Sequence, residues 1–453
     1  MNSAISHSPE RPRVVRLIAR LNVGGPAQHV AWLNAGLRDE FDCTLIAGNI
    51  SPGEDEMTDF ARNMGVEPII VSGLSREISL RDLPAAWHVY RLLLKLKPDI
   101  VHTHTAKAGT IGRIAATLYR WFTPATLIGR PRACRVVHTY HGHVFHSYFG
   151  RTKTRLILLI EKVLAQVTDR IVVISRRQLE EITSLLGADH ESQFCIIPLG
   201  LDLERFSGWQ NRRPFIREAI GAEPDDILVG IVGRLVDVKN HELFLNAVAA
   251  FVSDYASRLD HRVRFVIIGN GPLQEQLMQQ SRDLHLAGHV TFMGLRTDPE
   301  NFYPGLDIVM LTSKNEGTPL SLIEAMANGR PVLSTAVGGV VDLLGDLRDV
   351  NSSPLTRSTV SPAAPHSLPM PSLKRKIEAV CAVHAHGLAA AADPASLAAG
   401  VFQLAADSQL RATLGTQGEM FARQAHSIDR LLKDVTGLYR SLLSMEPEST
   451  TRE

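Results

Sequence analysis

The amino-acid sequence predicts an α/β protein built from two doubly wound parallel-sheet domains. The chain has 453 residues, which is more than one hydrophobic core normally serves. Short apolar runs alternate with longer helical patterns, as is typical of parallel sheets covered by helices. Glycines, histidines and charged residues recur directly after the apolar runs, at the strand ends where such sheets bind their ligands.

The composition narrows the class of protein. Hydrophobic residues make up 45% of the chain and the formal net charge is +1, which indicates a soluble globular protein and no nucleic-acid partner. The four cysteines are scattered without a C-x-x-C pair, so reduced thiols in the cytoplasm are expected rather than disulfides or a zinc site. No apolar run is long enough for a transmembrane helix, and residues 1–12 are expected to be a disordered leader rather than a signal peptide.

Residues 13–200 are expected to form the first domain. Gly24 and Gly25 lie between its first strand and a helix, where glycines let the backbone approach a ligand and helix N–H groups face an anion. A tight turn is the alternative explanation of this pair. The predicted strands are 14–18, 43–47, 67–71, 100–104, 136–140 and 170–175, and the helices between them include 27–37, 84–96 and 109–121.

Two strand ends of this domain are rich in histidine, in V-H-T-H-T-A-K-A-G and H-T-Y-H-G-H. We expect His104, His141 and His143 to line a cleft and to form hydrogen bonds with a sugar or a phosphate, and a structural histidine is the alternative for each. Lys107 would add positive charge for an anionic acceptor, although a solvated lysine is equally expected. Imidazoles are also zinc ligands, but no carboxylate or cysteine lies in register with them, so a metal site is not expected.

Residues 201–425 are expected to form the second domain, with strands at 227–232, 264–268, 290–295 and 307–311. After the first of these strands, Gly233 permits close backbone approach, and Arg234 and Lys239 offer two cations that suit a diphosphate. Two solvated surface cations are the alternative. Further ligand-facing positions are expected where the next two strands end: Gly269, Gly271 and Leu295.

The stretch E-G-T-P-L-S-L-I-E carries two carboxylates, Glu316 and Glu324, on either side of a predicted helix start. Thr318 is a suitable N-cap and Pro319 a suitable first helical residue. A helix N-terminus behind a glycine binds anions, and two nearby acids suit hydroxyl groups, so the combination indicates a nucleotide sugar. The donor is expected to contact the residues around the helix start: Gly317, Thr318, Pro319 and Leu320.

These motifs together resemble the family 4 glycosyltransferases of the GT-B fold. The resemblance rests on G-G-P-A-Q-H, V-H-T-H-T-A-K-A-G, H-T-Y-H-G-H, G-R-L-V-D-V-K-N-H, I-G-N-G-P and the E-x7-E stretch, in family order over most of residues 13–345. It implies two Rossmann-like domains facing an interdomain cleft, the first for the acceptor and the second for the nucleotide sugar. It also implies a retaining enzyme of the EC 2.4 type. Such an enzyme moves a sugar, favouring a UDP donor over GDP or ADP, to a glycan or lipid-linked acceptor of cell-surface polysaccharide or glycolipid biosynthesis.

The resemblance implies roles for individual residues. Glu316 matches the acid that contacts sugar hydroxyls near the reacting carbon, and Glu324 matches the acid that holds the ribose. Arg234 and Lys239 match the pair that neutralises the leaving diphosphate. His141 matches the histidine beside the transferred sugar.

Other features bear on cofactors and alternatives. No D-x-D pattern occurs in the chain, so neither a divalent metal nor another cofactor is expected to be required. Gly24 and Gly25 match the family turn that faces the donor phosphates or the acceptor. The alternatives are a catalytically silent nucleotide-sugar-binding protein, and a nonhydrolytic epimerase or phosphorylase of the same fold. The complete E-x7-E stretch favours transfer.

Three segments lie outside this pattern. Residues 151–166 are basic and then apolar, typical of a core helix or of a surface helix that lies on an anionic membrane, so peripheral association with the inner face of the plasma membrane is a further expectation. Residues 346–375 are rich in proline and serine and are expected to be an insertion, with H-A-H-G-L at 384–388 as the displaced continuation of the domain. Residues 426–453 hold a last helix, at 427–443, that is expected to return to the first domain.

Overall fold

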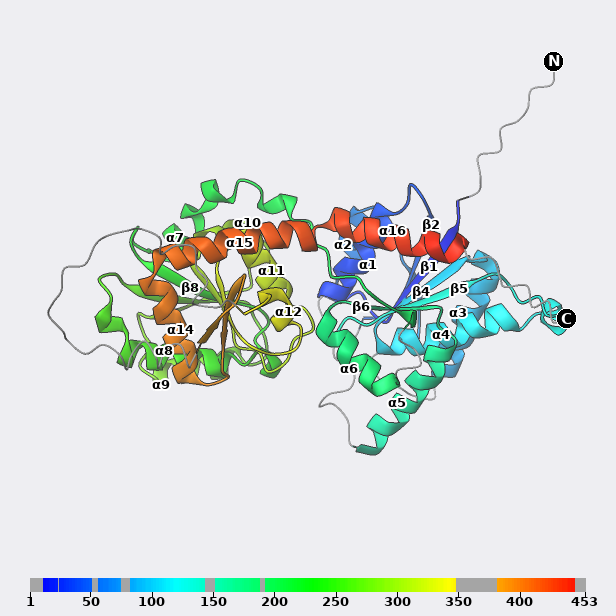
Figure 1. Cartoon of the computed structure of the whole chain (residues 1–453), viewed down its shortest axis with the longest axis horizontal. Helices are drawn as coiled ribbons and strands as arrows, with labels where there is room; N and C mark the ends of the chain where they lie inside the picture. The colour runs from blue at the N-terminus through cyan, green and yellow to red at the C-terminus, as the bar shows by residue number, and fades with distance from the viewer. Residues whose placement is uncertain are drawn as a thin grey trace, which may run out of the picture. The chain divides into compact units, whose positions relative to one another are not determined.

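The computed structural model describes residues 11–22, 24–50, 56–74, 82–142, 151–187, 192–347 and 381–444. The chain divides into two compact units. One unit contains the residues up to Leu201 together with those from Ile428 onward, and the other is Asp202–Ser427. Within the described residues each unit has one seven-stranded sheet covered by helices (Figure 1). This is the α/β, doubly wound class that the sequence predicts.

The sheet of the first unit is parallel throughout, in the order β3-β2-β1-β4-β5-β6-β7. The chain moves outward from β1 to β3 and then returns to the other side of β1, so the switch point lies between β1 and β4. The strands are β1 (Arg13–Ile18), β2 (Asp42–Gly48), β3 (Ile69–Val71), β4 (Ile100–His104), β5 (Arg135–Thr139), β6 (Arg170–Val173) and β7 (Phe194–Ile196).

Helices cover both faces of this sheet. Successive residues of β1 point to opposite faces, so that Val15 packs with α3 and α4 while Val14 packs with α1 and α16. None of the helices in the described residues is long and apolar enough to cross a membrane. The helical segments of this unit are α1 (Gly25–Gly36), α2 (Thr58–Asn63), α3 (Asp82–Leu96), α4 (Ala106–Trp121), η1 (Pro124–Ile128), α5 (Arg151–Gln166), α6 (Arg176–Leu186) and α16 (Ile428–Ser444).

The last helix of the chain, α16, packs on the first unit. Arg430 Nη2 donates hydrogen bonds to the carbonyl oxygens of Pro198 and Leu199, at 2.8 and 2.9 Å. Tyr439 is fully buried, and its hydroxyl forms a 2.6 Å hydrogen bond with Nδ1 of His102 on β4. Helix α16 therefore completes the core around the sheet of the first unit.

A buried ion pair joins α4 to α5. Nη2 of Arg113 lies 2.6 Å from Oε2 of Glu161, and both side chains are almost completely excluded from solvent. The hydroxyl of Tyr140 donates to the same carboxylate oxygen at 2.6 Å. Burial, with the Glu161 carboxylate beside it, raises the pKa of Tyr140, so this hydroxyl keeps its proton. The two charges satisfy each other, and they fix the spacing of two neighbouring helices.

The sheet of the second unit has the order β10-β9-β8-β11-β12-β14-β13. It is parallel apart from its edge strand β13, which pairs antiparallel with β14 and lies outside the strands predicted from sequence. The strands are β8 (Ile227–Val232), β9 (Val263–Ile268), β10 (Val290–Gly294), β11 (Ile308–Leu311), β12 (Val332–Thr335), β13 (Cys381–Val383) and β14 (Gly387–Ala390).

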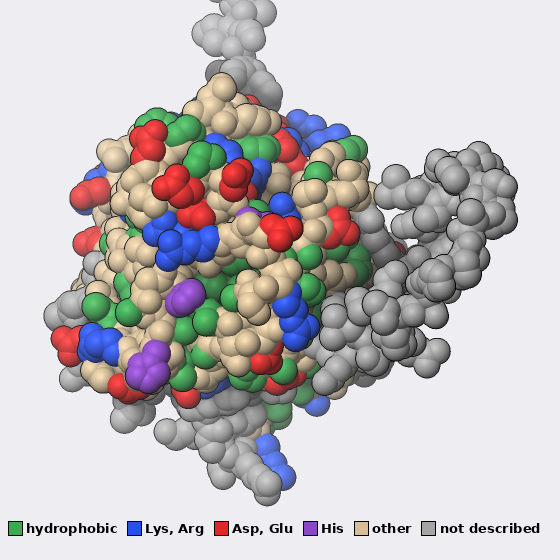
Figure 2. Space-filling view, turned by 90° about the vertical axis from the view of Figure 1, so that its left-hand side faces the viewer, with side chains coloured by type: hydrophobic (Ala, Val, Ile, Leu, Met, Phe, Trp, Pro, Cys, Tyr) green, Lys and Arg blue, Asp and Glu red, His purple; other side chains and the backbone are tan. Residues whose placement is uncertain are grey.

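A hydrophobic core of the second unit lies between this sheet and the helices α8 and α14. Basic and acidic side chains are interspersed on the face shown in Figure 2, in keeping with the net charge near zero. The helical segments of this unit include α7 (Pro214–Ala219), η5 (Asp237–Lys239), α8 (His241–Asp254), α9 (Gln274–Asp283), α10 (Pro299–Phe302), η7 (Tyr303–Gly305), α11 (Leu320–Ala327), α12 (Val340–Leu344), α14 (Pro394–Ala406) and α15 (Ser408–His426).

The elements predicted from sequence lie within a few residues of the observed ones, and β4, β8 and α5 have the predicted bounds. β14 begins inside H-A-H-G-L and pairs parallel with β12, so this stretch does continue the second sheet. The proposed insertion lies outside the described residues from 348 onward, as do residues 1–10 of the predicted leader.

Candidate functional site

An ion pair connects two strand ends of the second unit. β8 and β11 are neighbouring parallel strands, so the loops after them lie side by side. Lys239, in the loop after β8, places Nζ 2.6 Å from Oε1 of Glu316, in the loop after β11. Ser313 Oγ donates to the same oxygen, also at 2.6 Å. Two residues that were predicted separately are therefore in direct contact.

Further hydrogen bonds hold these two loops together. The backbone N–H of Lys314 donates to the carbonyl of Val238 at 2.9 Å, and Thr312 Oγ1 donates to the carbonyl of Asn240 at 2.9 Å. Asn240 has a φ of 52°, a left-handed conformation that asparagine tolerates better than most residues. Because these hydrogen bonds join the two loops, Lys239 is a positioned cation rather than a solvated one.

The second predicted acid, Glu324, lies on α11 and accepts a hydrogen bond from the hydroxyl of Tyr303 at 3.0 Å. Burial raises the pKa of Glu324 to about 7, although the hydrogen bond from Tyr303 acts in the opposite direction. Tyr303 is fully buried in η7; its local sequence carries no signal of a site residue, and sequence reasoning missed it. A carboxyl group with one fixed donor can still accept hydrogen bonds from ligand hydroxyls.

The start of α11 differs from the prediction. The helix begins at Leu320, and Pro319 is its N-cap residue, with extended backbone (ψ 111°) and no side-chain cap. The predicted roles of Thr318 as N-cap and of Pro319 as first helical residue are therefore wrong, because the chain enters the helix one residue later. Thr318 Oγ1 is buried and has no hydrogen-bond partner among the described residues. The first N–H groups of α11 lack intrahelical acceptors, as at any helix start, and Gly317 precedes them.

Two of the predicted ligand-facing glycines have another explanation. A Cβ at Gly269 would lie 2.0 Å from the carbonyl oxygen of Gly233, and a Cβ at Gly271 would lie 2.5 Å from that of Leu235. The loops after β8 and β9 thus pack backbone against backbone, and glycine is required there by protein contacts. A Cβ at Gly233 would meet only the flexible stem of Lys239, at 3.7 Å, so close approach remains open there.

Arg234 and Leu295 are exposed at the carboxyl ends of two strands of this sheet. Arg234 follows Gly233 directly after β8, and its guanidinium forms no ion pair with the part of the chain that the structure describes. Leu295 follows β10 and is 58% exposed. Both side chains are therefore exposed to solvent, and their contact with a donor stays a prediction.

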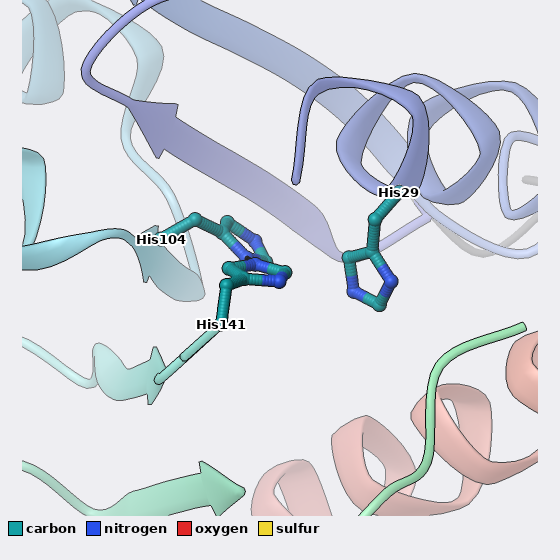
Figure 3. Close-up of side chains that lie close together, drawn as sticks. All are labelled: His29, His104 and His141. Atoms are coloured by element: carbon teal, nitrogen blue, oxygen red, sulfur yellow. Dashed lines mark hydrogen bonds between the residues drawn. The ribbon is translucent and has the colours of Figure 1, made fainter. Parts of the chain in front are cut away.

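In the first unit, three imidazoles converge at the strand ends (Figure 3). His104 ends β4, His141 follows β5, and His29 comes from α1. His104 Nδ1 and His141 Nε2 share a hydrogen bond of 3.0 Å. The ring of His29 packs edge-on against that of His141, with centroids 4.9 Å apart. His29 was not predicted as a site residue. The signal that could have identified it was its position in the helix after Gly24 and Gly25, which lie at this end of the sheet.

Burial keeps these imidazoles neutral. Burial lowers the pKa of His141 to about 4. It also lowers the pKa of His29 and of His104 well below the ordinary value, and for these two the neighbouring imidazoles add to the effect. His104 is completely buried, so the prediction that it lines a cleft is wrong; it supports the ring of His141 instead. Lys107, in the first turn of α4, is only 6% exposed and is not a solvated lysine. His143 lies outside the described residues.

The remaining histidines of the two motifs are structural. Nε2 of His102 forms a 2.7 Å hydrogen bond with Thr139 Oγ1, and Nδ1 of His138 forms a 2.8 Å hydrogen bond with Thr103 Oγ1. Each bond links neighbouring strands β4 and β5. These two rings therefore stabilise the centre of the sheet and are not available to a ligand.

One nitrogen from each of His29, His104 and His141 lies within 4.8 Å of the others, which is the donor set of a three-histidine metal site. The hydrogen bond between His104 and His141 accounts for one nitrogen of each of those two rings without an ion. The expectation that the protein requires no metal stays a prediction.

Comparison with known proteins decides the family. Residues 23–205 match the family model described as Glycosyltransferase Family 4, and residues 212–351 match the one described as Glycosyl transferases group 1. A relative from Escherichia coli is 32% identical over 307 residues, or 66% of this chain and 73% of the relative. That relative is a UDP-Gal:alpha-D-GlcNAc-diphosphoundecaprenol alpha-1,3-galactosyltransferase. The chain belongs to glycosyltransferase family 4.

Solved structures show the fold of this glycosyltransferase. Anabaena HepE in complex with UDP matches with a TM-score of 0.68 at 18% identity, over 95% of this chain and 100% of that chain. Sucrose-phosphate synthase of Thermosynechococcus elongatus matches with a TM-score of 0.67 at 18% identity, over 96% of this chain and 100% of that chain. These matches show the GT-B fold, and the family match makes the protein a transferase of the EC 2.4 type.

Proposed function

We propose that this glycosyltransferase moves a sugar from a UDP-sugar to a lipid-linked glycan, with retention of anomeric configuration, in cell-surface polysaccharide or glycolipid biosynthesis. The observation that carries the proposal is the contact of Lys239 with Glu316, which places a cation and a carboxylate together beside a helix start. The E. coli relative is named for UDP-Gal and GlcNAc-diphosphoundecaprenol, and HepE has been solved with UDP-glucose. UDP-galactose and a GlcNAc-diphospholipid are therefore the first substrates to test.

The second unit binds the donor in this proposal. The leaving group is a nucleoside diphosphate, so the site must stabilise developing negative charge. Lys239, the exposed Arg234 and the N–H groups at the start of α11 are the groups that supply this stabilisation. The ammonium group of Lys239 has three N–H donors, so it can contact a phosphate while it stays paired with Glu316, and that carboxylate can also accept hydrogen bonds from sugar hydroxyls. Ser313, which also donates to Glu316, keeps that carboxylate oriented.

The first unit binds the acceptor in this proposal. His141 lies beside the transferred sugar, and His104 is a positioning residue that acts through its hydrogen bond with His141. A neutral imidazole donates from one nitrogen and accepts at the other, which suits sugar hydroxyls. Lys107 contributes positive charge near the start of α4, where a phosphate of the acceptor is also favoured by the helix N-terminus.

Peripheral association with the inner face of the plasma membrane completes the proposal, because a lipid-linked acceptor stays in the bilayer. α5 supports it: Leu159 and Val163 are more than half exposed on this helix, and Lys162 beside them is exposed as well. Apolar and basic side chains on one helix surface are typical of contact with anionic lipids. The enzyme would then work at the cytoplasmic surface.

Transfer is expected to need no divalent ion, since Lys239, Arg234 and the start of α11 supply the positive charge. After dialysis against EDTA, at least about half of the activity should remain. The measurement is product formation before and after adding back Mg²⁺, Mn²⁺ or Zn²⁺. Complete loss that only Mg²⁺ or Mn²⁺ reverses would mean that an ion bridges the diphosphate. Complete loss that only Zn²⁺ reverses would assign the ion to the three histidines.

Binding of UDP is expected to be roughly tenfold tighter at pH 8 than at pH 6 because of Glu324. The pKa of this carboxyl is about 7, and ribose hydroxyls that donate to it favour its ionised form, so its pKa falls on binding. Below pH 7, binding must first release a proton and affinity drops. Calorimetry on the wild type and on Glu324→Gln tests this, since the phosphates of UDP titrate equally in both. An identical pH dependence in the two proteins would remove Glu324 from the nucleotide site.

The proposed function is tested by calorimetry with UDP, GDP, ADP and their common sugars, followed by transfer assays with the best donor. UDP should bind most tightly, and Arg234→Ala should weaken it at least about tenfold. Arg258→Ala is the matched control, because this exposed arginine follows α8 at the opposite edge of the same sheet. Tightest binding of GDP or ADP would refute the UDP assignment. Tight binding without product from any acceptor would instead identify a silent nucleotide-sugar-binding protein.

A further inference from the structure

The outward side of α4 and of η1 is unusually apolar. Ile114, Leu118, Trp121 and Phe122 follow one another at helical spacing and are all exposed, Phe122 at 72%. Such a spacing places them along a single face of the helix. In η1, which follows directly, Leu127 is 90% exposed. A soluble surface seldom presents so many large apolar side chains side by side without a partner.

The neighbouring helix α3 extends this surface. α3 and α4 share one hydrophobic core on the same face of the sheet, so their outward sides are adjacent. Leu83 and Trp87 are exposed at 73% and 58% on the outward side of α3, one helical turn apart. The outward sides of α3, α4 and η1 together are named the α3–α4–η1 face here.

The exposed charged side chains that the structure describes on this face are basic. Arg91, Lys95 and Arg130 are exposed, and the guanidinium of Arg120 lies over the ring of Trp121, 5.6 Å from its centroid, while it also pairs with Asp169. Residues 82–133 contain two acids, Asp82 at the start of α3, whose side chain is not among those that the structure describes, and Asp99. Asp99 lies in the loop before β4, where it accepts a hydrogen bond from the backbone N–H of Arg13. The exposed side chains that the structure describes on this face are therefore apolar or basic.

We propose that the α3–α4–η1 face docks on an anionic phospholipid surface. Exposed aromatic and aliphatic side chains enter the interfacial region, and arginines and lysines around them contact the anionic headgroups. A face formed only by apolar and basic groups suits such a bilayer better than a typical protein interface, whose centre excludes charge and whose rim carries both signs.

Docking in this way has a consequence for the acceptor. α4 starts directly after His104, and its apolar stripe runs along the side of the helix. If this stripe contacts the membrane, α4 lies parallel to the membrane plane. Its first turn and the adjacent histidines are then near the level of the headgroups. The diphosphate of a lipid-linked acceptor lies at that level. This inference rests on the proposed lipid-linked acceptor, while the lipid contact itself is measurable without any transfer.

The test is sedimentation of the purified full-length enzyme with phosphatidylcholine vesicles, with and without phosphatidylglycerol. Wild type should bind the anionic vesicles and be released by salt. Trp121→Ser with Phe122→Ser should lower partitioning at least about tenfold, and Arg130→Glu about fivefold or more. Phe215→Ser is the matched control, since Phe215 is 56% exposed on α7 of the second unit, and it should bind as wild type does. Circular dichroism checks that each variant is folded.

Three results would overturn the proposal: no binding of wild type to anionic vesicles, equal binding to neutral vesicles, or unchanged binding of the Trp121 and Phe122 variant. Light scattering can give a fourth such result. If the wild type is a dimer and the variant a monomer, the face is a contact between two copies of the chain. Transfer to a short-chain, water-soluble GlcNAc diphosphate separates the two proposals. The variant should retain this activity within about twofold, as its substitutions lie outside the catalytic groups. Vesicle binding without any transfer by wild type would uphold the lipid surface and refute the proposed function.

Discussion

Replacing Lys239 by methionine is expected to lower kcat by about 100- to 1,000-fold, with a much smaller change in the KM for the donor. Methionine keeps an unbranched apolar stem and removes the ammonium group that Glu316 positions at 2.6 Å. That charge acts mainly on the diphosphate as it leaves, so its loss raises the barrier more than it weakens binding. The measurement is the initial rate at saturating acceptor over a range of UDP-galactose concentrations.

Lys314→Met is the matched control, because Lys314 lies in the same pair of loops but pairs with the exposed Asp237. Its rate should stay within about twofold of the wild type. A rate within about tenfold of wild type for Lys239→Met would remove Lys239 from the site. Equal losses in the two variants would indicate that the loops were disturbed rather than that one charge was lost.

The second large effect concerns stability. Glu161→Ala is expected to destabilise the first unit by about 3–5 kcal/mol, since it leaves the Arg113 guanidinium buried without its carboxylate. Tyr140 would lose the acceptor of its hydroxyl as well. Urea unfolding followed by tryptophan fluorescence suits this measurement, because three of the four tryptophans, Trp32, Trp87 and Trp121, lie in the first unit.

Two further variants make this test specific. Glu161→Gln keeps an acceptor for Tyr140 and should lose less stability than the alanine variant. Glu180→Ala removes the partner of an exposed ion pair with Arg177 on α6 and should cost less than about 1 kcal/mol. If Glu161→Ala proves no more destabilising than Glu180→Ala, the buried pair does not hold α4 and α5 together.

The position of Lys239 and Glu316 shows how far sequence reasoning reaches. Each follows an apolar run, and this local signal is sufficient to place both residues at the carboxyl ends of strands. Their contact depends on β8 and β11 being neighbours in the sheet, a pairing between segments about 80 residues apart. No local pattern carries that information. The same holds for Tyr303, which becomes a partner of Glu324 only when η7 and α11 pack together.

Where sequence reasoning failed, a tertiary contact or a single backbone angle was responsible. Threonine is a residue type common at N-cap positions, but Pro319 has an extended ψ, so the helix begins one residue later than predicted from Thr318. His104 resembles a cleft residue in sequence, but it ends a central strand whose two faces are both covered, so it is completely buried. Gly269 matches a ligand loop, but its missing side chain accommodates the backbone of Gly233.

The fold class, the order of the strands along the chain and the residues at their carboxyl ends can be predicted from the sequence alone, because hydrophobic periodicity and glycine positions are local properties. The tertiary structure decided which of those residues meet, which histidines are buried, and that apolar side chains from α3, α4 and η1 form one face. These outcomes depend on strand order and on the covering of each sheet face, and both are set by contacts between residues far apart in the chain.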